Sequence, residues 1–220
     1  MIVGWDDSYS KDNFNTDLEG DGAFICQNSW GDNFGENGFF YISYYDTNIG
    51  THNVVYTDIE NTDNYDHIYQ SDLCGWVGQL GYNKDSIYGA NVFTAEGNET
   101  LKAASFYATG KDSQYELYVV RQFEDETSLE KMIPVASGKL GNAGYYTVDF
   151  NQGIEVDAGE RYAVVLYIIT PGSVHPMAIE YAADEATENV DLDDGESYIS
   201  ANGSKWVSVD TVEKSNLCIK

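Results

Sequence analysis

The sequence predicts a mostly β protein in which a short β-sheet segment precedes a jelly-roll-like antiparallel β-sandwich. Aromatic residues are abundant, with 18 Tyr, 9 Phe and 4 Trp among 220 residues, and such side chains favour strands. The 21 Gly residues, together with Asn and Asp, supply the turns that join short strands. Between these turns lie about twelve short runs of β-branched and aromatic residues, as in all-β domains.

The first part of the chain predicts three strands. The loop from Asp6 to Gly22 is rich in Asp, Asn, Ser and Gly, which suits an exposed connection. After Thr47 the pattern loosens, and the polar run at 61–64 is the strongest linker signal. We therefore predict two domains, residues 1–62 and 63–220. The expected strands of the first domain are Ile2–Trp5, Ala23–Gln27 and Gly38–Tyr44.

The second part predicts a longer series of short strands, bounded by turns as in a sandwich. The one helical signal is Ser128–Met132, where Ser128 is the expected cap. The expected strands are Ala90–Ala95, Lys102–Thr109, Tyr115–Arg121, Tyr145–Phe150, Arg161–Ile169, Met177–Tyr181, Ser197–Ala201, Trp206–Val209 and Leu217–Ile219.

The charge excludes two classes of partner. Eleven Lys and Arg against 37 Asp and Glu give a formal charge of −26, which would repel nucleic acid and anionic membrane surfaces. The longest apolar run, Ala163–Ile169, is far too short to span a bilayer, and no signal-peptide pattern follows Met1. The acidic, Tyr-rich composition is typical of secreted microbial proteins, so we expect an extracellular or cell-surface location.

A contiguous motif carries the strongest functional signal. Gln27–Asn28–Ser29–Trp30–Gly31 is followed by Gly35–Glu36–Asn37–Gly38–Phe39, and Ile2–Val3–Gly4–Trp5 lies upstream. This arrangement resembles the C-terminal part of the catalytic domain of papain-like cysteine peptidases. The resemblance implies that residues 1–62 form part of a papain-like β-barrel half-domain, with Phe34 where the family usually has a second tryptophan.

The resemblance assigns catalytic roles to Asn28 and Trp30. A thiolate–imidazolium pair needs a third group that fixes the orientation of the imidazole, and the Asn28 carbonyl would accept that hydrogen bond. Trp30 would shield it from water. The alternative is that Asn28–Ser29 forms an ordinary turn and Trp30 belongs to the core.

The family's other catalytic residues are not found in this chain. By resemblance, the catalytic histidine would lie just before Met1, and the nucleophilic cysteine and oxyanion-hole glutamine still earlier. His52, His67 and His175 all follow Asn28 and cannot replace that histidine by order. We therefore expect a fragment of a cysteine peptidase that is inactive alone, or one that pairs with a separate upstream polypeptide.

The sequence has three cysteines, and no two of them form a C-x-x-C motif, so no zinc ribbon is encoded. Cys26 is expected to be a small buried hydrophobe rather than a nucleophile. Cys74 and Cys218 could form a disulfide that joins the two ends of the second domain, although sequence does not define the geometry.

An acidic run near the C-terminus offers oxygen ligands of the kind that calcium prefers. No cofactor is expected, but a structural calcium is an alternative to a solvated acidic turn. The candidate ligands are Asp191, Asp193, Asp194 and Glu196, with Asn189 beside them.

The second domain resembles the lectin-like β-sandwich that accompanies papain-like peptidases on bacterial and archaeal cell surfaces. The resemblance rests on Asp63–Gln70, Gly75–Trp76, Gly89–Phe93, Leu101–Phe106 and Cys218–Lys220. Because fold does not define function, sugar binding does not follow from it. Aromatic side chains that could stack on a sugar, unless they are packing residues, are Trp76, Tyr82, Tyr88, Tyr198 and Trp206.

Two hypotheses follow. The first is a peptidase fragment whose parent hydrolyses peptide or protein substrates, and the second is a non-catalytic module that binds a glycan, a cell-wall ligand or a protein. In a fragment, the apolar strands of residues 1–62 would lack a complete core, so we expect self-association through this segment or disorder within it.

Overall fold

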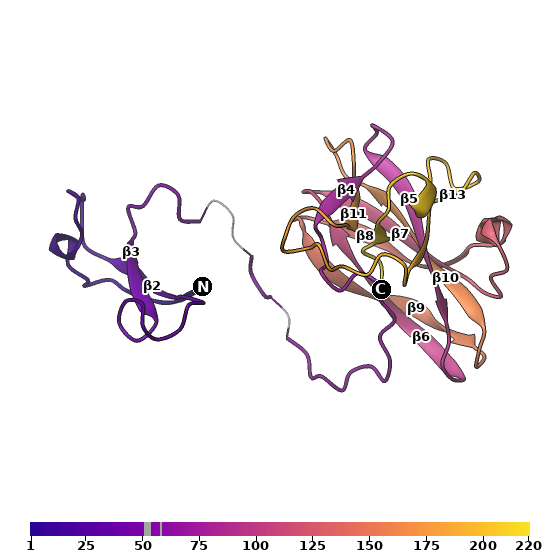
Figure 1. The fold of residues 1–220 in the computed structure, drawn as a ribbon, viewed down its shortest axis with the longest axis horizontal. Helices are drawn as coiled ribbons and strands as arrows, with labels where there is room; N and C mark the ends of the chain where they lie inside the picture. Colours follow the sequence, from indigo (N-terminus) through magenta and orange to yellow (C-terminus); the bar gives the residue numbers. More distant parts are fainter. Residues whose placement is uncertain (51–53, 58) are drawn as a thin grey trace. The chain divides into compact units, whose positions relative to one another are not determined.

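The computed structural model describes residues 1–50, 54–57 and 59–220. The chain forms two compact units, Met1–Ile59 and Glu60–Lys220 (Figure 1). Strands and three short 3-10 helices are the regular elements, and the described residues contain no α-helix. The prediction of a mostly β fold is confirmed. His52 lies outside the described residues.

The first unit is a three-stranded antiparallel sheet in the order β1-β2-β3. Its strands are β1 (Ile2–Asp6), β2 (Ala23–Gln27) and β3 (Phe39–Ser43), close to the expected ranges. In the central strand, Cys26 pairs with Ile2 on one side and Phe40 on the other. A 3-10 turn, η1 (Lys11–Asn13), lies in the long loop between β1 and β2.

The first unit has little core. Apart from Ala23 and Cys26, its apolar residues are only partly buried or exposed, and Trp5 and Trp30 are 69% and 76% exposed. Because the described residues of this unit form a single sheet, they supply no second layer of strands or helices to cover either face. Its buried residues, within the part that the structure describes, are Gly22, Ala23, Cys26, Gly38 and Ser43.

The second unit is a sandwich whose first layer is a six-stranded antiparallel sheet in the order β13-β12-β5-β10-β7-β8. The central strand β10 pairs along its whole length with β5, residue Val165 opposite Ala90, because both runs are apolar and β-branched or small. The bounds are β5 (Ser86–Thr94), β7 (Ser113–Val120), β8 (Ile133–Leu140), β10 (Arg161–Ile169), β12 (Glu196–Ser200) and β13 (Val207–Ser208).

The second layer contains two smaller sheets that the C-terminal end of the chain joins. One is the pair β6–β9 and the other has the order β14-β11-β4. Phe106 of β6 forms a bridge with Ile219, just beyond β14, and the backbones of Ser105 and Lys220 exchange two hydrogen bonds of 2.9 Å. The bounds are β4 (Gly78–Leu80), β6 (Glu99–Ala108), β9 (Gly144–Val156), β11 (Met177–Glu180) and β14 (Asn216–Leu217).

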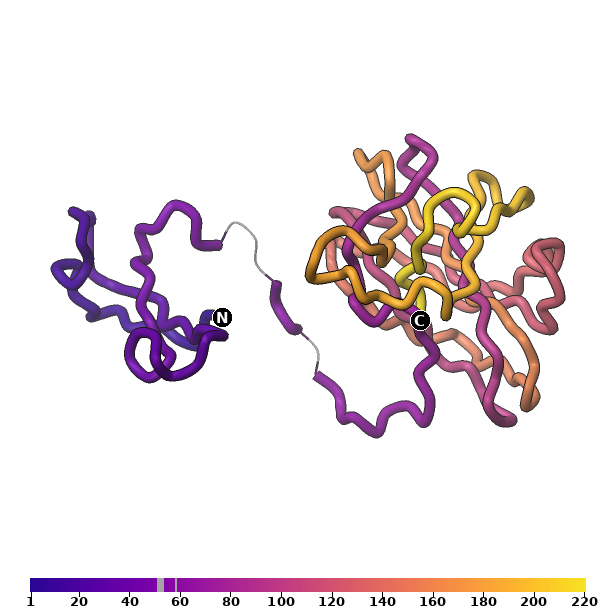
Figure 2. Tube along the Cα trace, in the orientation of Figure 1, coloured from indigo at the N-terminus to yellow at the C-terminus, as the bar shows by residue number. Residues whose placement is uncertain are grey.

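The core of the second unit lies between these layers. Phe106 and Leu217 from the second layer and Leu166 from the first are fully or almost fully buried in one cluster. The yellow C-terminal end lies against the body of the unit, beside the purple segment that enters it (Figure 2). Its last residues are therefore structural.

Two strands, β4 and β8, were not predicted from the sequence. β4 is three residues long and includes Gly78, whereas β8 includes Pro134 and Gly138, which are unfavourable in a strand interior. β8 tolerates proline because it is the edge strand of its sheet. The expected helical turn exists as the 3-10 helix η2 (Glu126–Glu130), but Asp125 is its cap and Ser128 completes the capping box.

The cysteines form no disulfide. Cys26 and Cys218 are buried and Cys74 is exposed, all three as free thiols, so the suggested Cys74–Cys218 bridge is wrong. The Cys74 backbone instead donates to the carboxylate of Glu180, while the thiol of Cys218 lies in the interior near Asp72.

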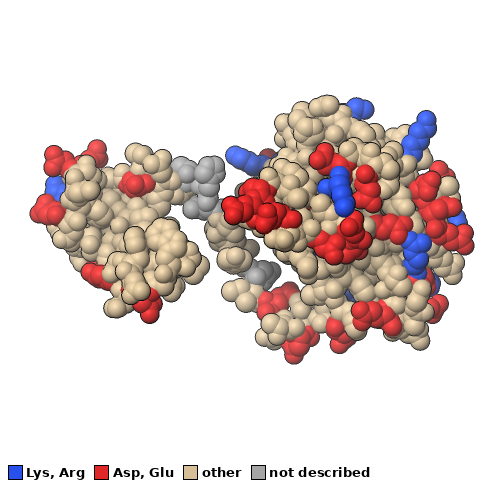
Figure 3. Space-filling view, in the orientation of Figure 1, with Lys and Arg blue, Asp and Glu red and all other residues tan. Residues whose placement is uncertain are grey.

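The surface in view carries many Asp and Glu side chains on the second unit, with Lys and Arg scattered among them (Figure 3). Within the described residues, no helix has the length and apolar character needed to cross a membrane.

Candidate functional site

The side chain of Asn28 is held by the loop that follows β2. Its Nδ2 donates to the carbonyl of Gly38 at 2.9 Å and to that of Phe34 at 3.4 Å. Its Oδ1 accepts from the Trp30 backbone N–H at 2.6 Å. Since a carbonyl oxygen has two lone pairs, Oδ1 can accept one further hydrogen bond. The amide is thus fixed with its oxygen available.

Trp30 lies on the surface beside this amide. Its ring meets Phe34 edge to face at 5.1 Å, and Phe34 meets Phe40 in the same manner at 5.7 Å. Phe34 therefore occupies an aromatic position in the motif. Trp30 is not a core residue of this unit, because three-quarters of it is exposed.

Cys26 is poorly suited to nucleophilic chemistry. It is 3% exposed in the middle of β2, and burial raises the pKa of its thiol. Since the thiolate is the reactive form, a raised pKa disfavours attack at neutral pH. This environment favours the inert role predicted for Cys26.

Three of the five candidate ligand-binding aromatics meet on the outer face of the six-stranded sheet. Tyr88 stacks on Tyr167, its cross-strand partner, with ring centroids 4.2 Å apart, and Trp206 lies edge-on to Tyr88 at 6.2 Å. Tyr198 points to the same face from β12, and burial together with Glu196 raises its pKa to about 12. We call Tyr88, Tyr118, Tyr167, Tyr198 and Trp206 the aromatic face.

The other two candidates lie elsewhere. Trp76 packs against Tyr107 of β6 at 5.9 Å and is 37% exposed. Tyr82 packs against the main core and is partly buried. Neither belongs to the aromatic face, whereas Tyr118 and Tyr167 do. The strand register places Tyr118 and Tyr167 on this face. The sequence alone does not give that register, so neither residue was predicted.

The acidic candidates divide into two pairs. Asp193 forms an ion pair with Lys214 at 2.8 Å, and Glu196 pairs with Arg161, so cations already engage both carboxylates. The carbonyl of Asp191 and Oδ1 of Asp194 both face Asn216 Nδ2, at 2.8 and 3.3 Å. Asn189 contacts only its neighbour Glu188 by side-chain hydrogen bonding among the described residues.

Asn216 Nδ2 also lies near Ser71 O, at 2.9 Å, and Glu180 Oε1, at 3.1 Å. Four oxygens thus surround a nitrogen that carries two hydrogens. Among the described residues, no group of three or more His, Cys, Asp or Glu side chains could hold a metal. The calcium site, with Asp191, Asp193, Asp194 and Glu196 as its candidate ligands, stays a prediction.

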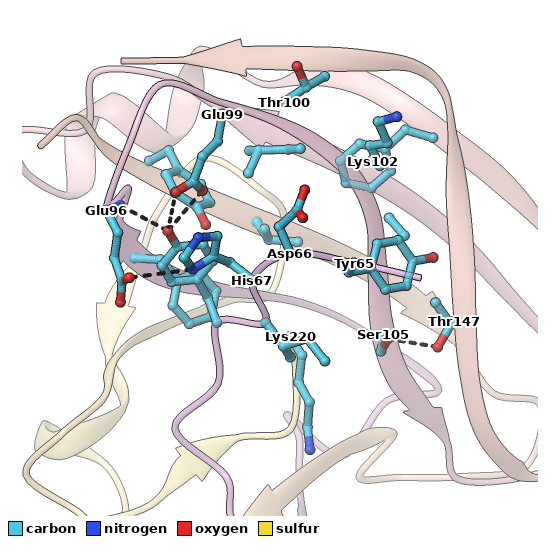
Figure 4. A pocket seen from close by; sticks show the side chains of 18 of the residues that line it. Tyr65, Asp66, His67, Glu96, Glu99, Thr100, Lys102, Ser105, Thr147 and Lys220 are labelled. Atoms are coloured by element: carbon cyan, nitrogen blue, oxygen red, sulfur yellow. Dashed lines mark hydrogen bonds and ion pairs between the residues drawn. The ribbon is translucent and has the colours of Figure 1, made fainter. Parts of the chain in front are cut away.

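A cavity of about 950 Å³ opens beside the β6–β9 pair, a size at the upper end of the range for ligand sites (Figure 4). One wall is the segment 64–69 and the other is the run 96–103, which includes the start of β6. Its floor consists of aromatic and apolar side chains from both layers: Phe93, Phe150, Tyr162 and Val164.

Side chains of segment 64–69 fasten it to the sheet at both ends. Tyr65 donates to Asp149 at 3.3 Å, and Tyr69 donates to Glu99 at 2.8 Å while it accepts from the Glu96 N–H at 2.9 Å. His67 Nδ1 lies 3.4 Å from Glu96 Oε2, on the same side of the cavity (Figure 4). We call this segment, residues 64–69, the strap, and its side chains hold it against the sheet.

Lys220, the last described residue, lies at the rim of the cavity. Its Nζ lies 3.4 Å from Oδ2 of Asp72 and 5.6 Å from the Tyr145 ring centroid. Asp72 is completely buried, and burial raises its pKa despite the opposing effect of Lys220. This ion pair secures the C-terminal end against the sheet.

The sequence did not indicate the cavity. Its walls lie about thirty residues apart in the chain and its floor comes from three further strands, so no local pattern marks it. The Asn28 motif was visible because its parts are nearly contiguous.

Two family matches account for most of the chain. The lectin-like domain family matches residues 68–220, and the papain family of cysteine proteases matches residues 1–59. No curated protein matches the chain.

Two solved structures are also similar to the chain. The chain is similar to a clostridial cysteine protease, Cwp84 after propeptide cleavage, with 29% identity and a TM-score of 0.79. It is also similar to the cysteine protease and lectin-like domains of Cwp84, described as a surface layer associated protein of Clostridium difficile, with 27% identity and a TM-score of 0.65. These matches cover 99% of this chain but 55% and 50% of the two solved chains, so the chain spans about half of their length.

Proposed function

Because the chain belongs to the lectin-like domain family through residues 68–220 and carries a papain-family segment at 1–59, we propose that it is the C-terminal part of a cell-surface cysteine peptidase. In this role residues 1–59 contribute the orienting group of a papain-type site, and the second unit is an accessory binding domain. The similarity to a surface layer associated protease supports the location.

The orientation of the Asn28 amide carries this proposal. Both hydrogens of Nδ2 are directed to backbone carbonyls, so the amide cannot turn without losing those bonds. Oδ1 keeps one lone pair for an imidazole N–H. Such a bond would hold the ring in the tautomer that accepts a proton from the cysteine thiol, and the resulting thiolate attacks the substrate carbonyl. The thiolate and the imidazole would come from residues other than 1–220.

Hydrolysis of a fluorogenic peptide under reducing conditions tests the proposal. We expect no hydrolysis by residues 1–220 and alkylation-sensitive hydrolysis by a chain extended at its amino end through the preceding reading frame. In the extended chain, Asn28→Ala should lower kcat/KM at least about tenfold, because the imidazole loses its orienting partner. The exposed Asn13→Ala is the matched control.

Two results would contradict this proposal. Hydrolysis by residues 1–220 that disappears in Cys26→Ala would make Cys26 the nucleophile. Equal activity of the Asn28→Ala and Asn13→Ala chains would remove Asn28 from the site.

A second candidate function rests on the aromatic face. The stacked pair Tyr88–Tyr167 is only partly buried, and the hydroxyls of Tyr118 and Tyr198 bond to the carboxylates of Glu116 and Glu196. Apolar ring faces beside carboxylate acceptors suit the C–H faces and hydroxyls of a neutral glycan.

Calorimetric titration with cellohexaose and with chitohexaose tests this function. Binding that Tyr88→Ala weakens at least about tenfold, and Tyr82→Ala leaves unchanged, would support it. Absence of binding to either oligosaccharide at about 1 mM would argue against it.

A further inference from the structure

The second layer of the sandwich has an open strand edge beside the cavity. The backbone of Ser105 bonds to Lys220 in both directions, so its N–H and C=O point away from β9. In an antiparallel strand, residues two apart direct these groups to the same side. Ala103 therefore presents its N–H and C=O to the edge where Lys220 lies. Its register partner on β9 is Asp149, after which the β6–β9 pairing is interrupted.

No described residue completes this edge. Outside the β6–β9 ladder, the backbone groups of residues 99–103 make no hydrogen bond with any part of the chain that the structure describes. The strap 64–69 likewise makes no backbone hydrogen bond within the described residues, because Tyr65 and Tyr69 fasten it by their side chains. Two backbone runs without main-chain partners thus face one cavity.

We propose that this groove, between the β6 edge and the strap, binds an extended peptide that adds a strand to the second layer next to β6. Backbone groups would supply the affinity, as in other cases of β-strand addition, and the floor would supply specificity. The proposal deepens the accessory binding role of the second unit and does not depend on peptidase activity of residues 1–59.

The lining specifies the peptide. Phe93, Phe150 and Tyr162 on the floor favour apolar side chains at alternate positions of a strand. The polar lining contains three carboxylates, those of Asp66, Glu96 and Glu99, and two amines, those of Lys102 and Lys220. The charge of Lys220 is already paired with the buried carboxylate of Asp72. With a formal charge of −26 for the whole chain, a neutral or basic peptide is favoured over an acidic one.

Titration calorimetry on the full chain tests the proposal with a capped hexapeptide that alternates valine with lysine and serine. We expect saturable binding, and an otherwise identical peptide with alternate amides N-methylated should bind at least about tenfold more weakly, because two or three backbone hydrogen bonds are lost. A peptide with glutamate in place of lysine should also bind more weakly, and Lys102→Glu should increase the difference between the two.

The position of the site has its own test. Ala103→Pro removes one outward N–H without removing a bond to β9, so it should weaken binding of the hexapeptide at least about fivefold. The N-methylated peptide gives the same information on the unaltered protein if this variant does not fold.

Three outcomes would overturn the proposal. They are no binding of the hexapeptide at about 1 mM, equal affinity for the N-methylated peptide, and hydrogen-exchange protection of residues 99–103 by cellohexaose or chitohexaose but not by the peptide. Failure of hydrolysis in the extended chain, by contrast, would affect only the peptidase proposal.

Discussion

Glu160 provides the most quantitative test of how the second unit is held together. Its carboxylate accepts from Arg121 Nε at 2.9 Å and Nη2 at 2.5 Å, and also from the backbone N–H groups of Gln122 and Asp157. The Glu160 side chain is 7% exposed, and the bidentate bond with Arg121 is the main cause that lowers its pKa from 4.5 to about 2. The carboxylate thus joins the end of β7 to the turn before β10.

We expect Glu160→Gln to lower the free energy of unfolding at pH 7 by about 2 kcal/mol. The lowered pKa corresponds to about 3 kcal/mol at ~1.4 kcal/mol per pKa unit, and we reduce this figure because the Arg121 side chain is 35% exposed to screening solvent. The native pKa lies below the unfolded value, so the stabilisation is complete above about pH 5 and disappears as the pH falls towards 2.

Urea unfolding followed by calorimetry or circular dichroism, at several pH values, measures this difference. The exposed Glu130→Gln, which removes one negative charge elsewhere, is the matched control. A loss of less than about 0.5 kcal/mol for Glu160→Gln at pH 7, or a loss that does not change between pH 7 and pH 3, would refute the reasoning.

Three further outcomes are expected. Asp72→Asn should gain stability relative to the natural chain as the pH rises from 3 to 7 in urea unfolding, because burial raises the native pKa of Asp72 and its ionised form is the costly one; a constant difference would contradict this. The chain should self-associate through residues 1–59, with Trp5→Ser weakening the association about tenfold in analytical ultracentrifugation, and a monomer at every concentration would argue against it. Calcium should raise the midpoint of thermal unfolding, and Asp194→Asn should abolish the increase if the acidic loop binds the ion, whereas an equal increase in both chains would place calcium elsewhere.

Local patterns predicted much of the fold. The range of β10 was predicted residue for residue, because it contains the longest apolar run, Ala163–Ile169, and is preceded by turn residues. The range of β2 was predicted equally well. By contrast, β8 was missed because Pro134 and Gly138 disfavour a strand, and only the topology shows that β8 is an edge strand, where proline is tolerated.

The candidate sites divide in the same way. Asn28 and Trp30 were found because their motif is nearly contiguous, and their hydrogen bonds remain within ten residues of Asn28. The aromatic face was found in part, since Tyr88, Tyr198 and Trp206 were named without Tyr167, which only the register of β5 with β10 brings beside Tyr88. The cavity was missed because non-local contacts create it.

The C-terminal residues connect binding in the groove with stability. Leu217 pairs with Ile179 of β11, and Ile219 bridges to Phe106 of β6, so this segment joins the two sheets of the second layer. Lys220 then ends at the rim of the cavity, where it contacts Asp72. A peptide that bonds to Ala103 would extend the same row of hydrogen bonds beyond Ser105. Since such a ligand binds only the folded layer, it would raise the free energy of unfolding by RT ln(1 + [L]/Kd).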